Sequence, residues 1–240
     1  MRTKLLIPLC FLLLIPTHFL FAEFTGNFLL SPVDCEQTGK CTLTYDLYFK
    51  DTNGIIWKAN AENTTDGASI PEWAQPFVGK PFDSTYLKAA VIHDHYCNRH
   101  VRPWYQTHRA FYDALIDLGV ESKKAKAMYY AVLIGGPKWM FLIPGNNCGK
   151  NCTNSFPNNE SYDGIEDNYK KTTIISRPER FKDKAVLTEI ANINRILIVK
   201  GSDLSLQELE ERALNRFPND IFLRNRNKYV KLSNFKLSDQ

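Results

Sequence analysis

The first half of the fold is decided by the stretch Cys41-Thr-Leu-Thr-Tyr-Asp-Leu-Tyr-Phe-Lys-Asp-Thr-Asn-Gly-Ile-Ile-Trp57. Apolar and polar residues alternate along its first part, and an Asn-Gly step ending at Gly54 separates that part from a second apolar run. Alternation is typical of a half-buried strand, and Asn-Gly between two such runs is a strong hairpin signal. The extended pattern reaches from Phe24 to about Asn63, so we expect two or three antiparallel strands.

The period of the apolar residues changes after these strands. Residues 84–136 have helical spacing, with interruptions at Arg102-Pro103 and at residues 119–122, which predicts three helices. Strands followed by helices, without alternation of the two, indicate the α+β class. We therefore expect a small antiparallel sheet of two to three strands, followed by a three-helix antiparallel bundle, within residues 23–140.

The N-terminal segment resembles a secretory signal. Two cationic residues precede a charge-free apolar run at residues 5–15, and the small residue Ala22 ends the segment. We expect cleavage of residues 1–22 and a secreted or periplasmic protein that begins at Glu23. The alternative is an uncleaved anchor, but the apolar run is shorter than the roughly 20 residues of a spanning helix. No later segment of the sequence is long and apolar enough to be transmembrane.

The C-terminal part differs in composition. Residues 141–175 are rich in Asn, Gly, Ser and Pro, which predicts a loop or linker. Residues 176–240 predict a helical extension, in which Ser205 and Glu208 have the spacing of a capping box.

The charge balance argues against a nucleic-acid partner. The net charge of +4 falls to +2 when Arg2 and Lys4 leave with the signal, and the remaining cations are scattered among acidic residues. Nucleic-acid binding usually needs a basic face.

Five cysteines remain after the signal segment, and their spacing suggests a pairing. Cys35–Cys41 and Cys148–Cys152 are placed for short local disulfides, which leaves Cys97 as a buried free thiol on a helix. A zinc site at Cys148 and Cys152 is an alternative, although no second pair of ligands lies nearby in the sequence.

The remaining four histidines fall within sixteen residues. His93 and His108 belong to the apolar stripes of two helices joined by a tight turn, so they should face each other at similar height. With the neighbouring Asp94, this pair could serve acid/base chemistry or bind a metal. The alternative is a pair of hydrogen-bonded core histidines. His95 and His100 are expected to be solvated, away from the pair.

A second candidate element is the stretch Thr65-Asp-Gly-Ala-Ser-Ile-Pro71. Asp-Gly suits a turn, and Ser69 suits the cap of a short helix. The functional alternative is a loop that lies against the His-Asp helix and offers Asp66 and Ser69 to a ligand.

Several short motifs follow one another in a fixed order: Asp66-Gly-Ala-Ser-Ile-Pro71, a Gly-x-Pro step, Ala89-Ala90-x-x-His93-Asp94, His108-x-x-Phe111-Tyr112, Gly119-Val120, Met128-Tyr129, Ala131-Val132 and Gly136-Pro137-x-Trp139. The order of residues from about 42 to 140 is similar to that of DUF1353, a bacterial and phage family of uncharacterised proteins. The resemblance implies no activity. In that family the position of His108 is usually Asp, so a carboxylate–His pair would here be a His–His pair.

A fainter similarity of arrangement is to secreted phospholipase A2. That family has a calcium loop, a helix bearing His-Asp, and an antiparallel helix with an Asp that orients the His. Here Gly79-x-Pro81-x-Asp83 precedes His93-Asp94. The order Tyr96-Cys97 is reversed relative to that family, and the loop is not rich in glycine.

The sequence thus favours an extracytoplasmic hydrolase acting on an envelope component, a lipid ester rather than peptidoglycan. His93 would be the general base and His108 its orienting partner. Asp94 and Asp66 would bind a divalent metal, calcium or zinc, and Ser69 as nucleophile is a lower-ranked variant. The alternative is a non-catalytic envelope or phage-related module. One open pocket lined by His93, Asp94 and Asp66 would favour the enzyme.

Overall fold

The computed structural model describes residues 22–68, 70, 75, 79–143, 173–200, 203–226 and 230–231. Four predictions lie wholly or largely outside these residues: the signal segment up to residue 21, the loop or linker at residues 141–175, the Cys148–Cys152 pairing and the role of Ser69. In the part of the chain that is described, no helix combines the length and apolarity needed to cross a membrane.

The predicted hairpin is confirmed and forms the centre of the first sheet. Strand β4 (Leu47–Lys50) pairs antiparallel with β5 (Ile56–Ala59) on one side and with β1 (Glu23–Thr25) on the other. Asp51 holds the turn, because its carboxylate accepts hydrogen bonds from the amides of Asn53 and Ile55 at 2.9 Å each and from Trp57 Nε1 at 2.9 Å.

A second small sheet lies beside the first. It has the order β2-β3-β6, formed by β2 (Leu30–Ser31), β3 (Cys41–Leu43) and β6 (Thr64–Thr65). The predicted Cys35–Cys41 disulfide is present and ties the short 3-10 helix η1 (Cys35–Gln37) to β3. The expected small antiparallel sheet is therefore present, and residues 22–68 form two such sheets of three strands each.

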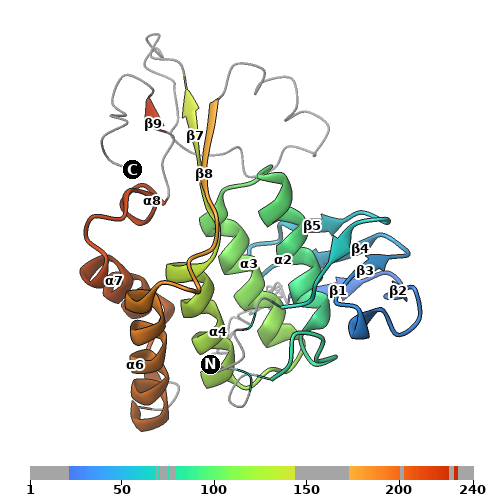
Figure 1. Cartoon of the computed structure of the whole chain (residues 1–240), viewed down its shortest axis with the longest axis horizontal. Coiled ribbons are helices and arrows are strands. Elements are labelled where there is room, and N and C mark those ends of the chain that lie inside the picture. The colour runs from blue at the N-terminus through green and yellow to red at the C-terminus, as the bar shows by residue number, and fades with distance from the viewer. Residues whose placement is uncertain are drawn as a thin grey trace, which may run out of the picture.

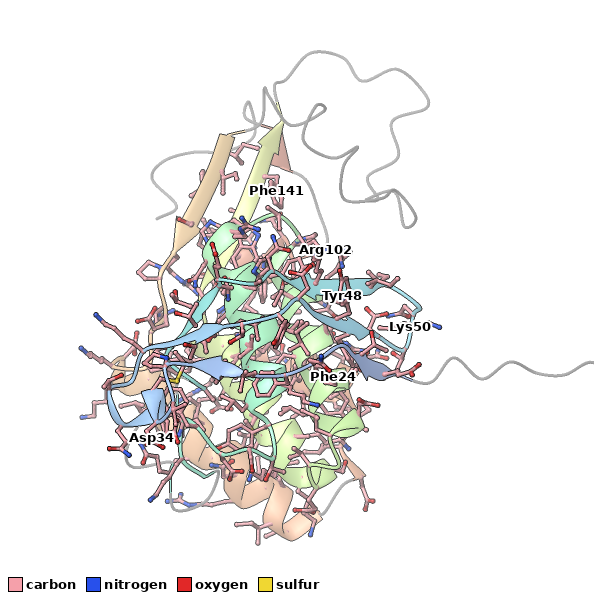
Figure 2. The ribbon with its side chains drawn as sticks, turned by 90° about the vertical axis from the view of Figure 1, so that its right-hand side faces the viewer. Phe24, Asp34, Tyr48, Lys50, Arg102 and Phe141 are labelled. Carbon is pink, nitrogen blue, oxygen red and sulfur yellow. A yellow bond between two sulfur atoms is a disulfide. The ribbon has the colours of Figure 1, made fainter. Side chains whose placement is uncertain are left out.

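The three predicted helices are α2 (Leu87–Arg99), α3 (Trp104–Asp117) and α4 (Ser122–Gly135). They pack side by side, with the small sheets on one side (Figure 1). Fully buried alanines on α2 and α3 allow close approach of the two helices. At the α2–α3 turn, Arg102 donates to the Ile56 carbonyl at 2.8 Å and lies over the Trp57 ring, which joins the bundle to β5 (Figure 2).

The C-terminal part adds helices and a third sheet. The long strand β7 (Lys138–Ile143) pairs antiparallel with β8 (Thr173–Arg177) and parallel with β9 (Val230–Lys231). This sheet was not predicted. Helices α6 (Lys184–Lys200), α7 (Leu206–Arg216) and α8 (Ile221–Arg224) lie on the other side of α4 from the small sheets (Figure 1). The predicted capping box at Ser205 and Glu208 is present.

The C-terminal helices share a hydrophobic cluster with α4 and β7. A buried carboxylate on α7 adds polar contacts, because Glu210 accepts hydrogen bonds from Tyr105 at 2.6 Å, Arg109 at 2.8 Å and Tyr129 at 2.8 Å. The C-terminal helices therefore pack on α4 and β7, and the division at residues 141–175 stays a prediction.

We expect Glu210→Ala to lower the free energy of unfolding by about 3 kcal/mol, because it leaves buried hydroxyls and a guanidinium without their acceptor. The neighbouring Glu211 is exposed, so Glu211→Ala should change stability by less than about 0.5 kcal/mol. Urea unfolding of both variants checks this. If Glu210→Ala and Glu211→Ala changed the free energy of unfolding equally, the contacts of Glu210 would not contribute to the stability of the core.

Candidate functional site

Helices α2 and α3 bring His93 and His108 into direct contact. His93 Nε2 lies 2.8 Å from His108 Nδ1, and their ring centroids are 4.9 Å apart. His93 is 8% exposed and His108 is fully buried. The facing pair predicted from helical spacing is therefore confirmed.

His108 is enclosed on its outer side by the end of α4. A Cβ atom on Gly136 would lie 3.2 Å from His108 Nε2. That nitrogen has no hydrogen bond of ordinary geometry within the described residues, although the Pro137 backbone interacts with the ring. Burial holds the pKa of His108 well below its usual value, and positive charge on His93 and Lys138 lowers it further. His108 is therefore neutral at pH 7.

The surroundings of His108 determine where its proton lies. Proline has no amide hydrogen, so the Pro137 backbone offers the imidazole only a carbonyl acceptor. Since His93 Nε2 lies against His108 Nδ1, we assign the proton of neutral His108 to Nε2, which leaves Nδ1 as an acceptor. His93 then donates through Nε2–H, and its Nδ1 keeps a lone pair, with Cys97 Sγ 3.8 Å away.

Asp94 lies on the Nδ1 side of His93. Its Oδ1 is 3.9 Å from His93 Nδ1, which is too long for a direct hydrogen bond. Its Oδ2 accepts a hydrogen bond from Thr65 Oγ1 at 2.7 Å, and Thr65 Oγ1 in turn accepts from the Gly67 amide at 3.0 Å. The β6 loop thus fixes the carboxylate beside the free nitrogen.

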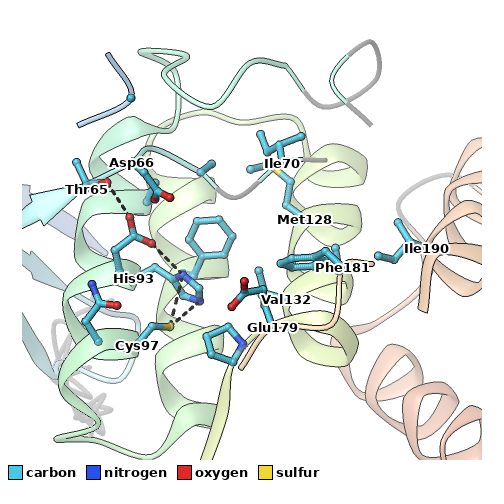
Figure 3. A pocket seen from close by; sticks show the side chains of 18 of the residues that line it. Thr65, Asp66, Ile70, His93, Cys97, Met128, Val132, Glu179, Phe181 and Ile190 are labelled. Atoms are coloured by element: carbon cyan, nitrogen blue, oxygen red, sulfur yellow. Dashed lines mark hydrogen bonds and ion pairs between the residues drawn. The ribbon is translucent and has the colours of Figure 1, made fainter. Parts of the chain in front are cut away.

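A pocket of about 630 Å³ opens in front of this group. Its lining includes His93, Asp94 and Asp66 together, with Asp66 exposed and Asp94 partly buried. Figure 3 shows Thr65, Asp66, His93 and Cys97 along one side, with Ile70, Met128, Phe181 and Ile190 across from them. The apolar wall consists of Ile70, Phe111, Met128, Val132, Phe181 and Ile190. The pocket therefore has a polar end with an imidazole and an apolar end.

Asp66 contributes negative charge at the polar end. Partial burial raises the pKa of its carboxyl, and the negative charges of Asp94 and Glu179 raise it further. Among the described residues, the compact groups of three possible metal ligands do not include Asp66. Metal binding by Asp66 and Asp94 stays a prediction.

The loop that carries Asp66 depends on Gly67. Gly67 has φ +81°, and a Cβ atom there would lie 2.6 Å from the Pro81 carbonyl oxygen. Gly119 has a similar φ of +76°, but a Cβ atom there would have nothing within 4 Å. We expect Gly67→Ala to lower the free energy of unfolding by about 1–3 kcal/mol more than Gly119→Ala, because it adds overpacking to backbone strain. Thermal unfolding measures both variants, and an equal loss of stability in Gly67→Ala and Gly119→Ala would contradict a tightly packed loop at Gly67.

Lys138 lies behind His108 and is completely buried. Its Nζ donates to the carbonyls of Ile134 at 3.1 Å and Gly136 at 3.5 Å, which fixes the turn that encloses His108. Burial lowers the pKa of Lys138 to about 7.

The other two histidines lie apart from the pair. His95 is 1% exposed, with Nδ1 at 3.1 Å from Asn63 Oδ1, and burial lowers its pKa to about 4. The expectation that it is solvated was wrong, because α2 is covered on this face by the β6 region. His100 is partly buried and stacks on Trp139.

Several lining residues were not assigned to the site from the sequence. Thr65 belongs to the predicted loop motif, but its hydrogen bond to Asp94 could not be inferred from the sequence. Cys97 was predicted correctly as a buried free thiol, but not as a neighbour of His93. Glu179 and Phe181 come from the C-terminal part, where no pattern indicated a contact with α2.

Comparisons with known proteins give relatives of unknown role. Residues 41–132 match the family described as "Protein of unknown function (DUF1353)". Uncharacterized protein y4iH of Sinorhizobium fredii (strain NBRC 101917 / NGR234) is 41% identical over 191 residues, which cover 78% of this chain and 74% of the relative. Uncharacterized protein y4jT of the same strain is 42% identical over 122 residues, covering 49% of this chain and 36% of that protein. No solved structure matches the chain.

Proposed function

The chain belongs to the DUF1353 family, and from this premise we propose that it hydrolyses an ester bond in an amphiphilic envelope component, with His93 as general base. The observation that carries this proposal is that His93, Asp94 and Asp66 line one pocket. A pair of histidines serving only to fill a core would not need a neighbouring carboxylate at the wall of a cavity.

In the proposed reaction, His93 Nδ1 removes a proton from water as the water attacks the ester carbonyl. The hydrogen bond from His93 Nε2 to His108 Nδ1, at 2.8 Å, fixes the ring and its tautomer. The resulting imidazolium is stabilised by Asp94, whose Oδ1 lies 3.9 Å away. The proton then passes from His93 to the departing alkoxide, which restores the starting state.

The pocket favours a lipid ester over peptidoglycan. Its apolar wall is suited to an acyl chain, which would be removed from water on binding. Three carboxylates, those of Asp66, Asp94 and Glu179, line the pocket, and they would repel an anionic headgroup. A neutral or cationic amphiphile is therefore the preferred substrate.

An extracytoplasmic location is part of the proposal. The Cys35–Cys41 disulfide supports it, since such bonds persist mainly in oxidising compartments.

The proposal is tested by incubating purified protein with neutral glycerol esters of increasing acyl length, with phosphatidylglycerol and with peptidoglycan. Release of fatty acid should be fastest from neutral esters with long chains. Binding of these lipids without release of fatty acid from any of them would favour the non-catalytic module and contradict the hydrolase.

A further inference from the structure

We propose that His93 Nε2, His108 Nδ1 and Cys97 Sγ together bind one zinc ion. The three atoms come from adjacent helices and lie within 4.8 Å of one another. The binding site is distinct from the predicted metal ligands Asp66 and Asp94, and its existence does not depend on the hydrolase function.

Two of the three distances between the donor atoms suit a tetrahedral ion after a small adjustment, and the third lies within 4.8 Å. Zinc binds His nitrogen at about 2.0–2.1 Å and Cys sulfur at about 2.3 Å, so tetrahedral N–N and N–S separations are roughly 3.3 and 3.5 Å. Cys97 Sγ lies 3.5 Å from His93 Nε2. The 2.8 Å separation between His93 Nε2 and His108 Nδ1 must open by about half an ångström, which a small rotation of either ring provides.

The outer nitrogens are His93 Nδ1 and His108 Nε2, which point away from the contact between the two rings. Asp94 Oδ1 lies 3.9 Å from His93 Nδ1, and the Pro137 backbone interacts with the His108 ring. Histidines that bind metals usually donate their second N–H to a carboxylate or a backbone carbonyl. If His93 Nδ1 and His108 Nε2 both carry protons, the facing atoms His93 Nε2 and His108 Nδ1 present lone pairs to each other. A cation between these two atoms would accept both lone pairs.

The site also has an open side. His93 and Cys97 line the pocket whereas His108 lies behind them, so the fourth ligand would come from the pocket as water or a bound anion. Three protein ligands with one open position are typical of catalytic rather than structural zinc sites.

Binding requires a change of protonation. Zinc replaces the thiol proton of Cys97, which is released to solvent, and the His93 proton moves from Nε2 to Nδ1, beside Asp94. Two N–Zn bonds and one S–Zn bond form, and no electron is transferred. Because His93 Nδ1 is then protonated, zinc would remove the general base. This last consequence alone rests on the proposed function.

A second group of possible ligands among the described residues, Cys35, Glu36 and Cys41, does not compete. Its two cysteines are joined in a disulfide and offer no thiolate. Cys148 and Cys152 lie outside the described residues and must be tested as an alternative source of thiolate.

The test uses full-length protein that has been treated with a chelator and then titrated with Zn²⁺ by calorimetry and with Co²⁺ by absorbance. We expect one ion per chain and a thiolate-to-cobalt charge-transfer band. Cys97→Ser should abolish the band and weaken zinc binding at least about tenfold, since loss of an outer-shell partner alone weakens binding 10–100-fold. His108→Asn should weaken binding similarly.

Two controls distinguish this site from others. His100→Gln and the double variant Cys148→Ser/Cys152→Ser should bind zinc as the unmodified protein does. Zinc-edge X-ray absorption of the unmodified protein, which needs no variant, should give two nitrogen ligands and one sulfur ligand. Absence of binding, a band that survives in Cys97→Ser, or loss of the band in the double variant would overturn the proposal. None of these measurements depends on ester hydrolysis, so a failure of the hydrolase proposal would be distinguished from a failure of the zinc proposal.

Discussion

His93→Gln is expected to reduce ester hydrolysis by a factor on the order of 10²–10⁴, the usual contribution of a general base. Glutamine cannot accept a proton at neutral pH. Its amide can still donate to His108 Nδ1, which lies 2.8 Å from His93 Nε2 in the unmodified protein. We therefore expect the free energy of unfolding to change by less than about 1 kcal/mol. Rates on the preferred ester and urea unfolding of the same preparation measure both quantities.

The matched control for this variant is His100→Gln, which makes the same change at a histidine at the end of the same helix, outside the pocket lining. It should keep full activity. If His93 instead has only a structural role, His93→Gln would lower stability by about 1–3 kcal/mol, with hydrolysis by the folded fraction unchanged. That result would remove His93 from the catalytic mechanism.

Lys138→Met is expected to remove a large pH dependence of stability. Burial lowers the pKa of Lys138 from 10.5 to about 7 in the folded protein. Between these values the unfolded chain binds the proton and the folded chain does not, so stability rises with pH across this window. Since each pH unit corresponds to about 1.4 kcal/mol, the gain between about pH 7 and pH 10 is at most about 4 kcal/mol.

The measurement is the difference in free energy of unfolding between Lys138→Met and the unmodified protein, followed by urea unfolding from pH 6 to pH 10. Taking this difference cancels the pH dependence that both proteins share, such as that from Cys97 and the buried tyrosines. The stability of the Met variant relative to the unmodified protein should be highest near pH 7 and should fall toward pH 10. Lys182 is exposed, and Lys182→Met should leave the pH profile unchanged. If the difference in free energy of unfolding between Lys138→Met and the unmodified protein does not change with pH, this lysine is not buried uncharged above pH 7.

Local sequence signals were sufficient for the central part of the fold. The Asn-Gly step ending at Gly54 determined the β4–β5 hairpin, and helical spacing with two breaks determined α2, α3 and α4. The same spacing placed His93 opposite His108, because both belong to apolar stripes of helices joined by a short turn. These features depend on residues close together in the chain.

Features that depend on distant contacts could not be inferred. Strand β7 pairs with β8 across about thirty residues of sequence and with β9 across about ninety, and no local pattern specifies such pairing. Glu179 and Phe181 reach the pocket only because the C-terminal part folds back on α4. His95 was misjudged because its burial comes from the loop near Asn63, on a different element.

The proposed mechanism depends most on one protonation state: His93 donating through Nε2 and presenting a bare Nδ1 to the pocket. It can be measured directly by ¹H–¹⁵N correlation spectra of metal-free protein labelled with ¹⁵N-histidine, with assignments from His93→Gln and His108→Asn. With the pair neutral, we predict that both His93 and His108 carry their proton on Nε2, and that His93 Nδ1 has the shift of an unprotonated nitrogen. A proton on His93 Nδ1, with Nε2 accepting from His108 Nδ1–H, would contradict the mechanism, because the pocket would then face no base.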